Sequence, residues 1–341
     1  MTRSDAKKLI LAQQRSDTND ERQVPARGHA QDKRRQGNAS AHFARAKPTA
    51  VYPRVNGTKQ ANLRQVARRH PPVESVRITT ADGTELAAEV QAPQSPRGAI
   101  IFVHGFCGNK GENGLFHALA ERCVEDGFAA VLYDWRGIAD SKGDFPSSTL
   151  HDHASDFERV AQWTKSRFGT KLGPLHAVGF SLGAAVIGLA LRRQLKLTSV
   201  AYLSPAARPR QCMWPKYNSE QLWRELETRG VVEKPGSSVL LGRAILESLR
   251  DTDLGPRAFD LKVPLLVCHG TDDVRIDCSH TRKLVKRIDS TSDFRYMEFE
   301  GASHSFRPAE ASWDKLGDAL TAWFGESLHL SRWRSAHGGN R

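Results

Sequence analysis

The run Gly-Phe-Ser-Leu-Gly at residues 179–183 restricts the fold more than any other stretch of the chain. It follows a short apolar run at residues 175–178 and opens an apolar segment at residues 184–191. This order predicts a strand, a tight turn and a helix, because the two glycines leave room for a sharp turn around the serine. Ser181 then faces the unpaired amides at the start of the helix. Since the same five residues also occur in ordinary turns, the rest of the chain decides their meaning.

Short apolar or alternating runs take turns with segments of helical spacing along most of the chain. An Asp-Gly turn at residues 82–83 predicts a hairpin between the first two strands. Strands that alternate with helices predict a doubly wound α/β fold, with a mostly parallel sheet covered on both faces. The expected strands lie at residues 73–79, 85–91, 99–103, 129–133, 175–178, 199–203, 264–268 and 294–299, and the expected helices at 115–126, 150–168, 184–191, 281–288 and 311–324.

Residues 205–259 interrupt this alternation. They show no clear strand–helix unit and are rich in tryptophan, tyrosine, proline and arginine. They lie between two expected strands, so the connection should cross the top of the sheet. We expect a helical lid insertion here, with Trp214, Tyr217 and Trp223 lining a substrate pocket beneath it.

The positive charge of the chain belongs to its first part. Residues 1–72 hold 16 Lys and Arg against 5 Asp and Glu, a net of +11, whereas the whole chain carries +12. A basic segment so poor in aromatics buries too little apolar area to fold, so we expect residues 1–70 to be a disordered tail. The domain is expected at residues 71–326, followed by a C-terminal tail at 327–341. This nearly neutral body gives no charge-based sign of a nucleic-acid or membrane partner.

Three interpretations of the basic tail compete. An organelle transit peptide is disfavoured by the acidic residues scattered through its first half. A basic arm could bind nucleic acid or an anionic surface. The third interpretation is a solvated tail with no partner, and we favour it.

Cysteine usage and hydropathy indicate the compartment. The five cysteines form no Cys-x-x-Cys pair and are odd in number, which is typical of a reducing environment. No apolar run reaches the roughly 20 residues of a membrane span, and the apolar run at residues 9–12 is too short for a signal peptide. We therefore expect a cytoplasmic protein without membrane insertion, for which a homodimer remains open.

A serine hydroxyl becomes a strong nucleophile only when a base takes its proton and a third group orients that base. In doubly wound hydrolases the three residues follow the chain order serine, acid, histidine, on loops after successive strands. Here Asp273 follows the expected strand 264–268, and His304 follows the strand 294–299. Asp272 competes for the acidic role, but the His-Gly-x-x-Asp spacing favours Asp273. The predicted triad is therefore Ser181, His304 and Asp273.

An oxyanion hole needs two preorganised N–H groups. The amide of Leu182, directly after the serine, is one candidate, and the amide of Phe106 in the loop after strand 99–103 is the other. Cys107 lies beside this loop and is expected to line the pocket. His104 and His269 precede glycines at strand ends and are expected to be structural. The Cys and His spacings match no zinc site, so no metal or cofactor is expected.

Residues 73–324 resemble the α/β-hydrolase superfamily, and more narrowly the serine-aminopeptidase-like hydrolases that include bacterial cinnamoyl and feruloyl esterases. The run His-Gly-Phe-Cys-Gly-Asn at residues 104–109 is similar to their oxyanion loop. Residues 133–143 resemble their Asp-x-x-Gly-x-Gly-x-Ser-x-Gly segment, with Ile138 and Ala139 in place of the usual His-Gly. By this resemblance Ser181, Asp273 and His304 carry over as nucleophile, acid and base.

The sequence thus predicts a serine hydrolase that cleaves a carboxylic ester of a small or medium acyl group through an acyl-enzyme. A small-molecule ester is the expected partner. A thioesterase or acyltransferase, or a peptidase that acts on small amides, would use the same residues. A protein that binds an anionic surface or nucleic acid through the basic tail is the alternative from another class. The sequence does not identify the acyl group, because the lid insertion is the part least similar to the family.

Overall fold

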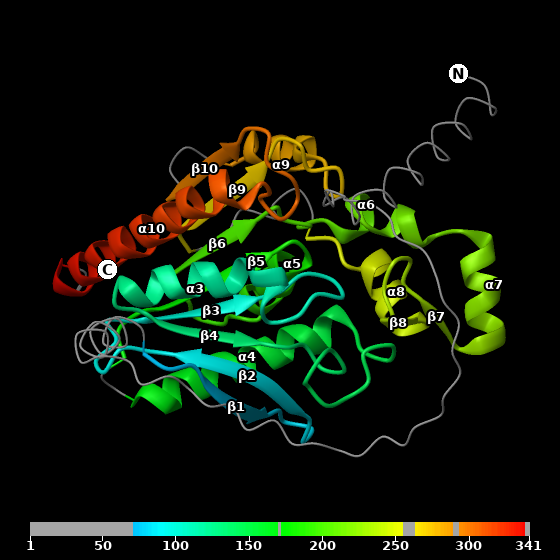
Figure 1. Ribbon diagram of the computed structural model, residues 1–341, viewed down its shortest axis with the longest axis horizontal. Coiled ribbons are helices and arrows are strands. Elements are labelled where there is room, and N and C mark those ends of the chain that lie inside the picture. The colour runs from blue at the N-terminus through cyan, green and yellow to red at the C-terminus, as the bar shows by residue number, and fades with distance from the viewer. Residues whose placement is uncertain (1–70, 170–171, 255–262, 289–292, 338–341) are drawn as a thin grey trace, which may run out of the picture. The chain divides into compact units, whose positions relative to one another are not determined.

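The computed structural model describes residues 71–169, 172–254, 263–288 and 293–337 (Figure 1). The tail expected at residues 1–70 lies outside the described residues, and so do residues 255–259 of the expected lid insertion. Side chains are described up to residue 326, except for those of residues 309–311.

The centre of the domain is an eight-stranded sheet with the order β1-β2-β4-β3-β5-β6-β9-β10. β1 and β2 form the expected antiparallel hairpin, β2 pairs antiparallel with β4, and all other neighbours are parallel. The predicted mostly parallel α/β sheet is therefore confirmed. The strands are β1 (Glu74–Thr79), β2 (Glu85–Gln91), β3 (Ala99–Val103), β4 (Ala129–Tyr133), β5 (Leu175–Phe180), β6 (Ser199–Leu203), β9 (Leu265–Gly270) and β10 (Phe294–Phe299).

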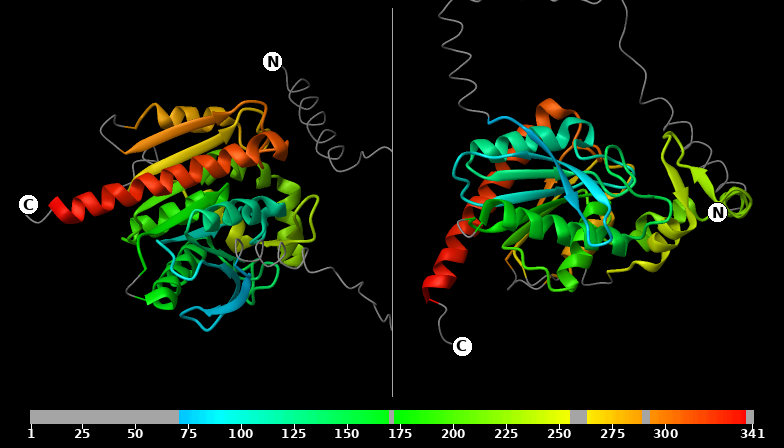
Figure 2. Two further views of the ribbon diagram at one scale, coloured as in Figure 1. Left: turned by 60° about the vertical axis from the view of Figure 1, so that its left-hand side comes forward. Right: turned by 90° about the horizontal axis from the view of Figure 1, so that it is seen from below.

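Helices cover both faces of this sheet (Figure 2). α3 (Leu115–Glu125) and α10 (Ala309–His337) pack on one face, and α4 (Leu150–Phe168) and α5 (Leu182–Arg192) pack on the other. α9 (Cys278–Val285) buries Leu284 in the same apolar core as α4 and α5. Every residue of β3, β4, β5 and β6 is buried, which explains why these strands are continuous apolar runs.

The expected helical insertion after β6 also contains strands, so a purely helical lid was wrong. Its helical parts are α6 (Pro209–Cys212), η3 (Trp214–Tyr217), α7 (Glu220–Arg229) and α8 (Arg243–Asp251). Between α7 and α8 the chain forms a two-stranded antiparallel sheet of β7 (Val231–Glu233) and β8 (Leu240–Gly242). A Pro-Gly pair at residues 235–236 turns the chain between the two strands, a signal that the helical interpretation overlooked.

The C-terminal helix is longer than expected. The sequence predicted its end near residue 324 and a tail from 327, whereas α10 continues to His337. No proline or glycine interrupts residues 326–337, so nothing in the backbone ends the helix earlier. Among the helices described, none combines the length and the apolar character needed to cross a membrane.

Candidate active site

β5 ends at Phe180, and the chain then turns sharply at Ser181 into α5. Ser181 has φ 51° and ψ −116°, a conformation that L-residues rarely adopt. The turn is held from both sides, because the Ser181 amide donates to the Leu203 carbonyl at 2.9 Å and its own carbonyl accepts from Ala206 at 2.9 Å. The strained backbone raises the serine at the end of the strand, as expected of a nucleophile elbow.

The two glycines of the motif are required by close packing. A β-carbon at Gly179 would lie 2.8 Å from the amide nitrogen of Ala184. One at Gly183 would overlap the carbonyl oxygen of Val103 in β3. The turn can therefore approach the neighbouring strand only because both positions lack a side chain.

Asp273 and His304 meet above the ends of β9 and β10. His304 Nδ1 donates to Asp273 Oδ2 at 2.6 Å, and both residues are buried. The other carboxylate oxygen, Oδ1, accepts from the amides of Arg275 at 2.9 Å and Ile276 at 2.8 Å. These backbone bonds fix the carboxylate, so that it can orient the imidazole.

The carboxylate of the adjacent residue, Asp272, does not take part in the hydrogen bond to His304. It is exposed, and within the described part of the chain its side chain accepts only from the Thr271 hydroxyl, at 3.3 Å. His269 instead joins the pair, with Nε2 within 3.0 Å of Asp273 Oδ2 and Nδ1 2.8 Å from the Thr281 hydroxyl. His269 thus braces the carboxylate, a role whose only sequence signal was its position four residues before Asp273.

The electrostatics of this pair suit a neutral base beside an ionised acid. Burial opposes ionisation of Asp273, but the hydrogen bonds from His269 and His304 outweigh it and hold the pKa below its usual range. Burial lowers the pKa of His304, and the Asp273 carboxylate opposes that effect only in part. At neutral pH His304 is therefore unprotonated and can accept a proton on its other ring nitrogen, Nε2.

The loop that carries His304 lies against the serine turn. The His304 ring packs on the ring of Phe180, with 4.9 Å between centroids, and the Ser204 hydroxyl donates to the His304 carbonyl at 2.9 Å. Neither Ser181 Oγ nor His304 Nε2 has a hydrogen-bond partner among the described residues. Such contacts are often long in sites without substrate.

The loop after β3 lies on the other side of the serine. A β-carbon at Gly105 would be only 3.2 Å from the β-carbon of Ser181, so the two backbones nearly touch. The amides of Phe106 and Leu182, the two expected oxyanion donors, have no hydrogen-bond acceptor among the described residues. Both N–H groups therefore remain available beside Ser181.

Several buried polar side chains hold this loop. His104 donates from Nδ1 to the Gly105 carbonyl at 2.8 Å, while its Nε2 accepts from the Trp135 amide at 3.0 Å. Asp134 accepts from the amide of Lys110 at 2.7 Å and from its ammonium at 2.9 Å. His104 was expected to be structural, whereas Asp134 was seen only as part of the segment 133–143.

The four residues expected to line the pocket form two groups in the structure, Tyr217 with Cys107 and Trp214 with Trp223. Tyr217 packs edge-on against Phe106, with 5.6 Å between ring centroids. Burial raises the pKa of the neighbouring Cys107 thiol to about 12, so this thiol stays protonated. Trp214 and Trp223 pack against each other, 5.6 Å between centroids, and each lies under an arginine of α8.

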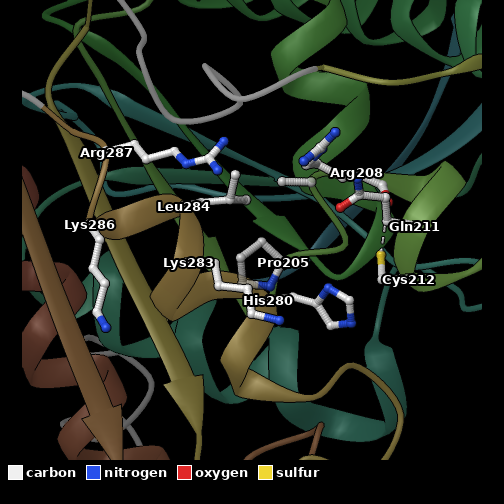
Figure 3. Close-up of a pocket in the computed structure, with 10 residues that line it drawn as sticks. Pro205, Arg208, Gln211, Cys212, His280, Lys283, Leu284, Lys286 and Arg287 are labelled. Atoms are coloured by element: carbon white, nitrogen blue, oxygen red, sulfur yellow. Dashed lines mark hydrogen bonds between the residues drawn. The ribbon is translucent and has the colours of Figure 1, made fainter.

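The domain also contains a separate cavity of about 480 Å³ (Figure 3). It lies between the chain that follows β6 and the helix α9, and none of the three expected catalytic residues lines it. Its walls carry an excess of positive charge, although Arg208 is already paired with Asp253 through two bonds of 2.9 Å. The lining residues are Pro205, Ala207, Arg208, Gln211, Cys212, His280, Lys283, Leu284, Lys286 and Arg287.

Within the described ranges, no group of three or more His, Cys, Asp or Glu side chains is arranged to hold a metal ion.

Known proteins resemble the chain over most of the domain. A family profile described as serine aminopeptidase, S33, matches residues 94–228, and one described as the prolyl oligopeptidase family matches residues 241–331. No curated protein matches the sequence.

Solved structures of esterases share the fold. Est1E from Butyrivibrio proteoclasticus, determined with ferulic acid bound, is 19% identical, with a TM-score of 0.61 over 74% of this chain and 100% of its own. An esterase from Pyrococcus furiosus is 14% identical, with a TM-score of 0.58 over 82% of this chain and 97% of its own. The esterase EaEST from Exiguobacterium antarcticum is 18% identical, with a TM-score of 0.54 over 73% of this chain and 99% of its own.

The sheet order, the serine turn between β5 and α5 and both family matches agree with one another. The chain therefore has the α/β-hydrolase fold, and residues 94–228 and 241–331 are similar to the serine aminopeptidase, S33, and prolyl oligopeptidase families.

Proposed function

We propose that this protein hydrolyses carboxylic esters of small or medium acyl groups, with Ser181 as nucleophile, His304 as general base and Asp273 as the acid that orients it. The observation that carries the proposal is the buried hydrogen bond of 2.6 Å between His304 and Asp273, on a loop that packs against the strained turn at Ser181. An imidazole oriented in this way presents its free nitrogen as a base.

The reaction begins when Ser181 Oγ attacks the acyl carbonyl carbon and His304 Nε2 takes the hydroxyl proton. Negative charge then develops on the carbonyl oxygen, which accepts hydrogen bonds from the amides of Phe106 and Leu182. The tetrahedral intermediate collapses as the carbon–oxygen bond to the alcohol breaks, and His304 returns the proton to the leaving oxygen. An acyl-enzyme on Ser181 remains.

Water completes the cycle by the same steps. His304 takes a proton from a water molecule, whose oxygen attacks the acyl carbon, and then returns that proton to Ser181 Oγ as the acid departs. In both half-reactions the imidazole becomes a cation beside Asp273. The low pKa of the Asp273 carboxyl keeps that neighbour negative throughout, so it stabilises the cation.

Ester substrates are favoured because the similar solved structures include esterases, one of them with ferulic acid bound. The packing of Tyr217 on Phe106 places an aromatic side chain from the insertion next to the oxyanion loop. We infer that η3 and the start of α7 form part of the acyl pocket through Tyr217, with Cys107, Trp214 and Trp223 around it.

A second candidate is hydrolysis of small amides, which the peptidase descriptions of both family profiles favour. The two candidates use the same residues and differ in the leaving group, because an amine must be protonated before it can leave. Thioesters are a third class open to the same nucleophile.

Turnover of matched p-nitrophenyl esters, thioesters and p-nitroanilides with the same acyl group tests the proposal. We expect kcat/KM for the esters to exceed that for the anilides, and Ser181→Ala to remove ester turnover while the protein stays folded by circular dichroism. Unchanged ester turnover in Ser181→Ala would overturn the proposed nucleophile. Anilide turnover equal to ester turnover would favour the peptidase.

A further inference from the structure

Glu112 is a buried carboxyl whose role the reaction above does not explain. It begins the short helix η1 (Glu112–Gly114) after the oxyanion loop, and it is only 8% exposed. Its Oε1 accepts a hydrogen bond from the Gly105 amide at 2.6 Å. A carboxylate is rarely buried without such a partner, because the charged group loses its hydration.

The loop is wrapped closely around this carboxyl. A β-carbon at Gly108 would overlap Glu112 Oε1, and one at Gly105 would lie 3.4 Å from it. The backbone of Glu112 itself has φ 44°, which is unusual for a residue other than glycine. The chain thus adopts a costly local conformation that turns the carboxyl into the loop.

Gly105 connects this carboxyl to the reacting serine. Its α-carbon lies against Ser181, and the next amide in the chain is that of Phe106. The Phe106 N–H direction depends on the peptide plane that follows Gly105, so the bond to Glu112 fixes the segment that aims it. Catalysis by such donors is sensitive to small displacements, because they must meet the oxyanion at 2.7–3.1 Å.

We propose that Glu112 is the positioning residue of the oxyanion loop, holding Gly105 so that the Phe106 amide points at the carbonyl oxygen of the substrate. The inference rests on the proposed function, because it presupposes an oxyanion beside Ser181. Glu112 acts through the backbone of Gly105 and does not touch the reacting atoms.

The charge of Glu112 changes in the neutral range. Burial raises the pKa of its carboxyl to about 7, against the opposing effects of the Gly105 amide and of Arg275 across the site. Lys110, two residues before Glu112, is already paired with Asp134, and the His117 ring is hydrogen-bonded to Glu89. An ionised carboxylate accepts a stronger hydrogen bond than a protonated one, so the loop is held more firmly above this pKa.

The test compares Glu112→Ala and Glu112→Gln with the same two substitutions at Glu85, an exposed glutamate of β2. In Glu112→Ala we expect kcat for a p-nitrophenyl ester to fall roughly 10- to 100-fold while KM changes less than about threefold. Affinity for a trifluoromethyl ketone, which forms an oxyanion on the serine, should fall by the same factor as kcat/KM. The Glu85 variants should match the wild type.

Glu112→Gln keeps an acceptor for the Gly105 amide but cannot ionise. Its kcat should resemble that of the wild type below the raised pKa of Glu112, where the carboxyl is also uncharged, and its pH–rate profile should lack the step near that pKa. A glutamine variant that retains this step, or an alanine variant with wild-type kcat, would overturn the inference.

Gly108→Ala offers an independent variant that leaves Glu112 in place. Its new methyl group should displace the carboxyl and lower kcat in the wild-type background, but lower it much less when Glu112 is already alanine. Additive effects of the two substitutions would contradict the proposed contact. Labelling with a fluorophosphonate distinguishes failure of the proposed function from failure of the positioning role. An unlabelled wild type would refute the proposed function, whereas a labelled wild type with fully active Glu112→Ala would refute only the positioning role.

Discussion

Replacing Asp273 by asparagine removes one charge and almost no volume. The carboxylate accepts four N–H donors, from His304, His269 and the amides of Arg275 and Ile276. Asparagine has one acceptor oxygen, and its NH₂ group can only donate. If the oxygen stays on the two amides, the NH₂ group faces His304 and favours the tautomer with the proton on Nε2, which cannot accept the serine proton.

The size of the effect follows from that tautomer. The same exchange in a serine protease triad lowers kcat by about 10⁴, equivalent to about 5.5 kcal/mol of activation free energy. The charge-assisted hydrogen bonds to His304 and His269 are also lost, although His269 Nε2 keeps the Ile276 carbonyl as an acceptor, so the free energy of unfolding should fall by about 1–3 kcal/mol. We therefore expect a folded variant with kcat reduced by roughly three to four orders of magnitude.

Asp272→Asn is the matched control. It is the adjacent aspartate, but it is exposed, and among the described residues its side chain bonds only the Thr271 hydroxyl. Its kcat should stay within about twofold of the wild type. Stopped-flow hydrolysis of a p-nitrophenyl ester and urea unfolding measure both quantities. A large loss of kcat in Asp272→Asn together with a small loss in Asp273→Asn would refute the assignment of the acid.

The remaining predictions concern stability and the N-terminal segment. Gly183→Ala should lower the free energy of unfolding by about 3 kcal/mol in urea titrations, because the new methyl group overlaps the Val103 carbonyl. The control is Gly317→Ala in α10, whose methyl group meets a flexible arginine side chain and should change the free energy of unfolding by less than about 1 kcal/mol. Burial lowers the pKa of His176 to about 3, so between pH 3 and the ordinary pKa near 6.5 the ring takes up a proton when the protein unfolds. The free energy of unfolding should therefore decline as the pH falls through this range. A urea midpoint that stays constant from about pH 7 to pH 4 would contradict this prediction. Deletion of residues 1–70 should leave kcat/KM within about twofold of the full-length value and should abolish salt-sensitive retention on a polyanion column. Loss of ester turnover in the deletion variant would instead show that the basic segment takes part in catalysis.

The sheet was largely predictable from the sequence for a physical reason. β3 and β4 match the expected boundaries at both ends, because strands buried on both faces read as continuous apolar runs between polar loops. The insertion was less predictable, since its elements are short and a two-stranded sheet interrupts its helices. Trp223, for example, lies between Trp214 and Arg243, which no local pattern connects.

The candidate site was likewise only partly predictable from the sequence. The sequence could place Ser181, Asp273 and His304 at the ends of strands, because continuous apolar runs mark where those strands end. The bracing contacts of His269 and Glu112 could not, because each depends on where a folded loop returns. The choice between Asp272 and Asp273 likewise depends on which side of one turn faces His304, and the structure puts Asp273 there.

The most direct test of the central claim is the mass of the full-length chain after reaction with a fluorophosphonate, followed by peptide mapping. We expect one adduct, on the peptide that contains Ser181, which is lost in Ser181→Ala and nearly lost in His304→Ala. An adduct on another serine, or ester turnover by a chain that forms no adduct, would contradict the assignment of Ser181 as the nucleophile.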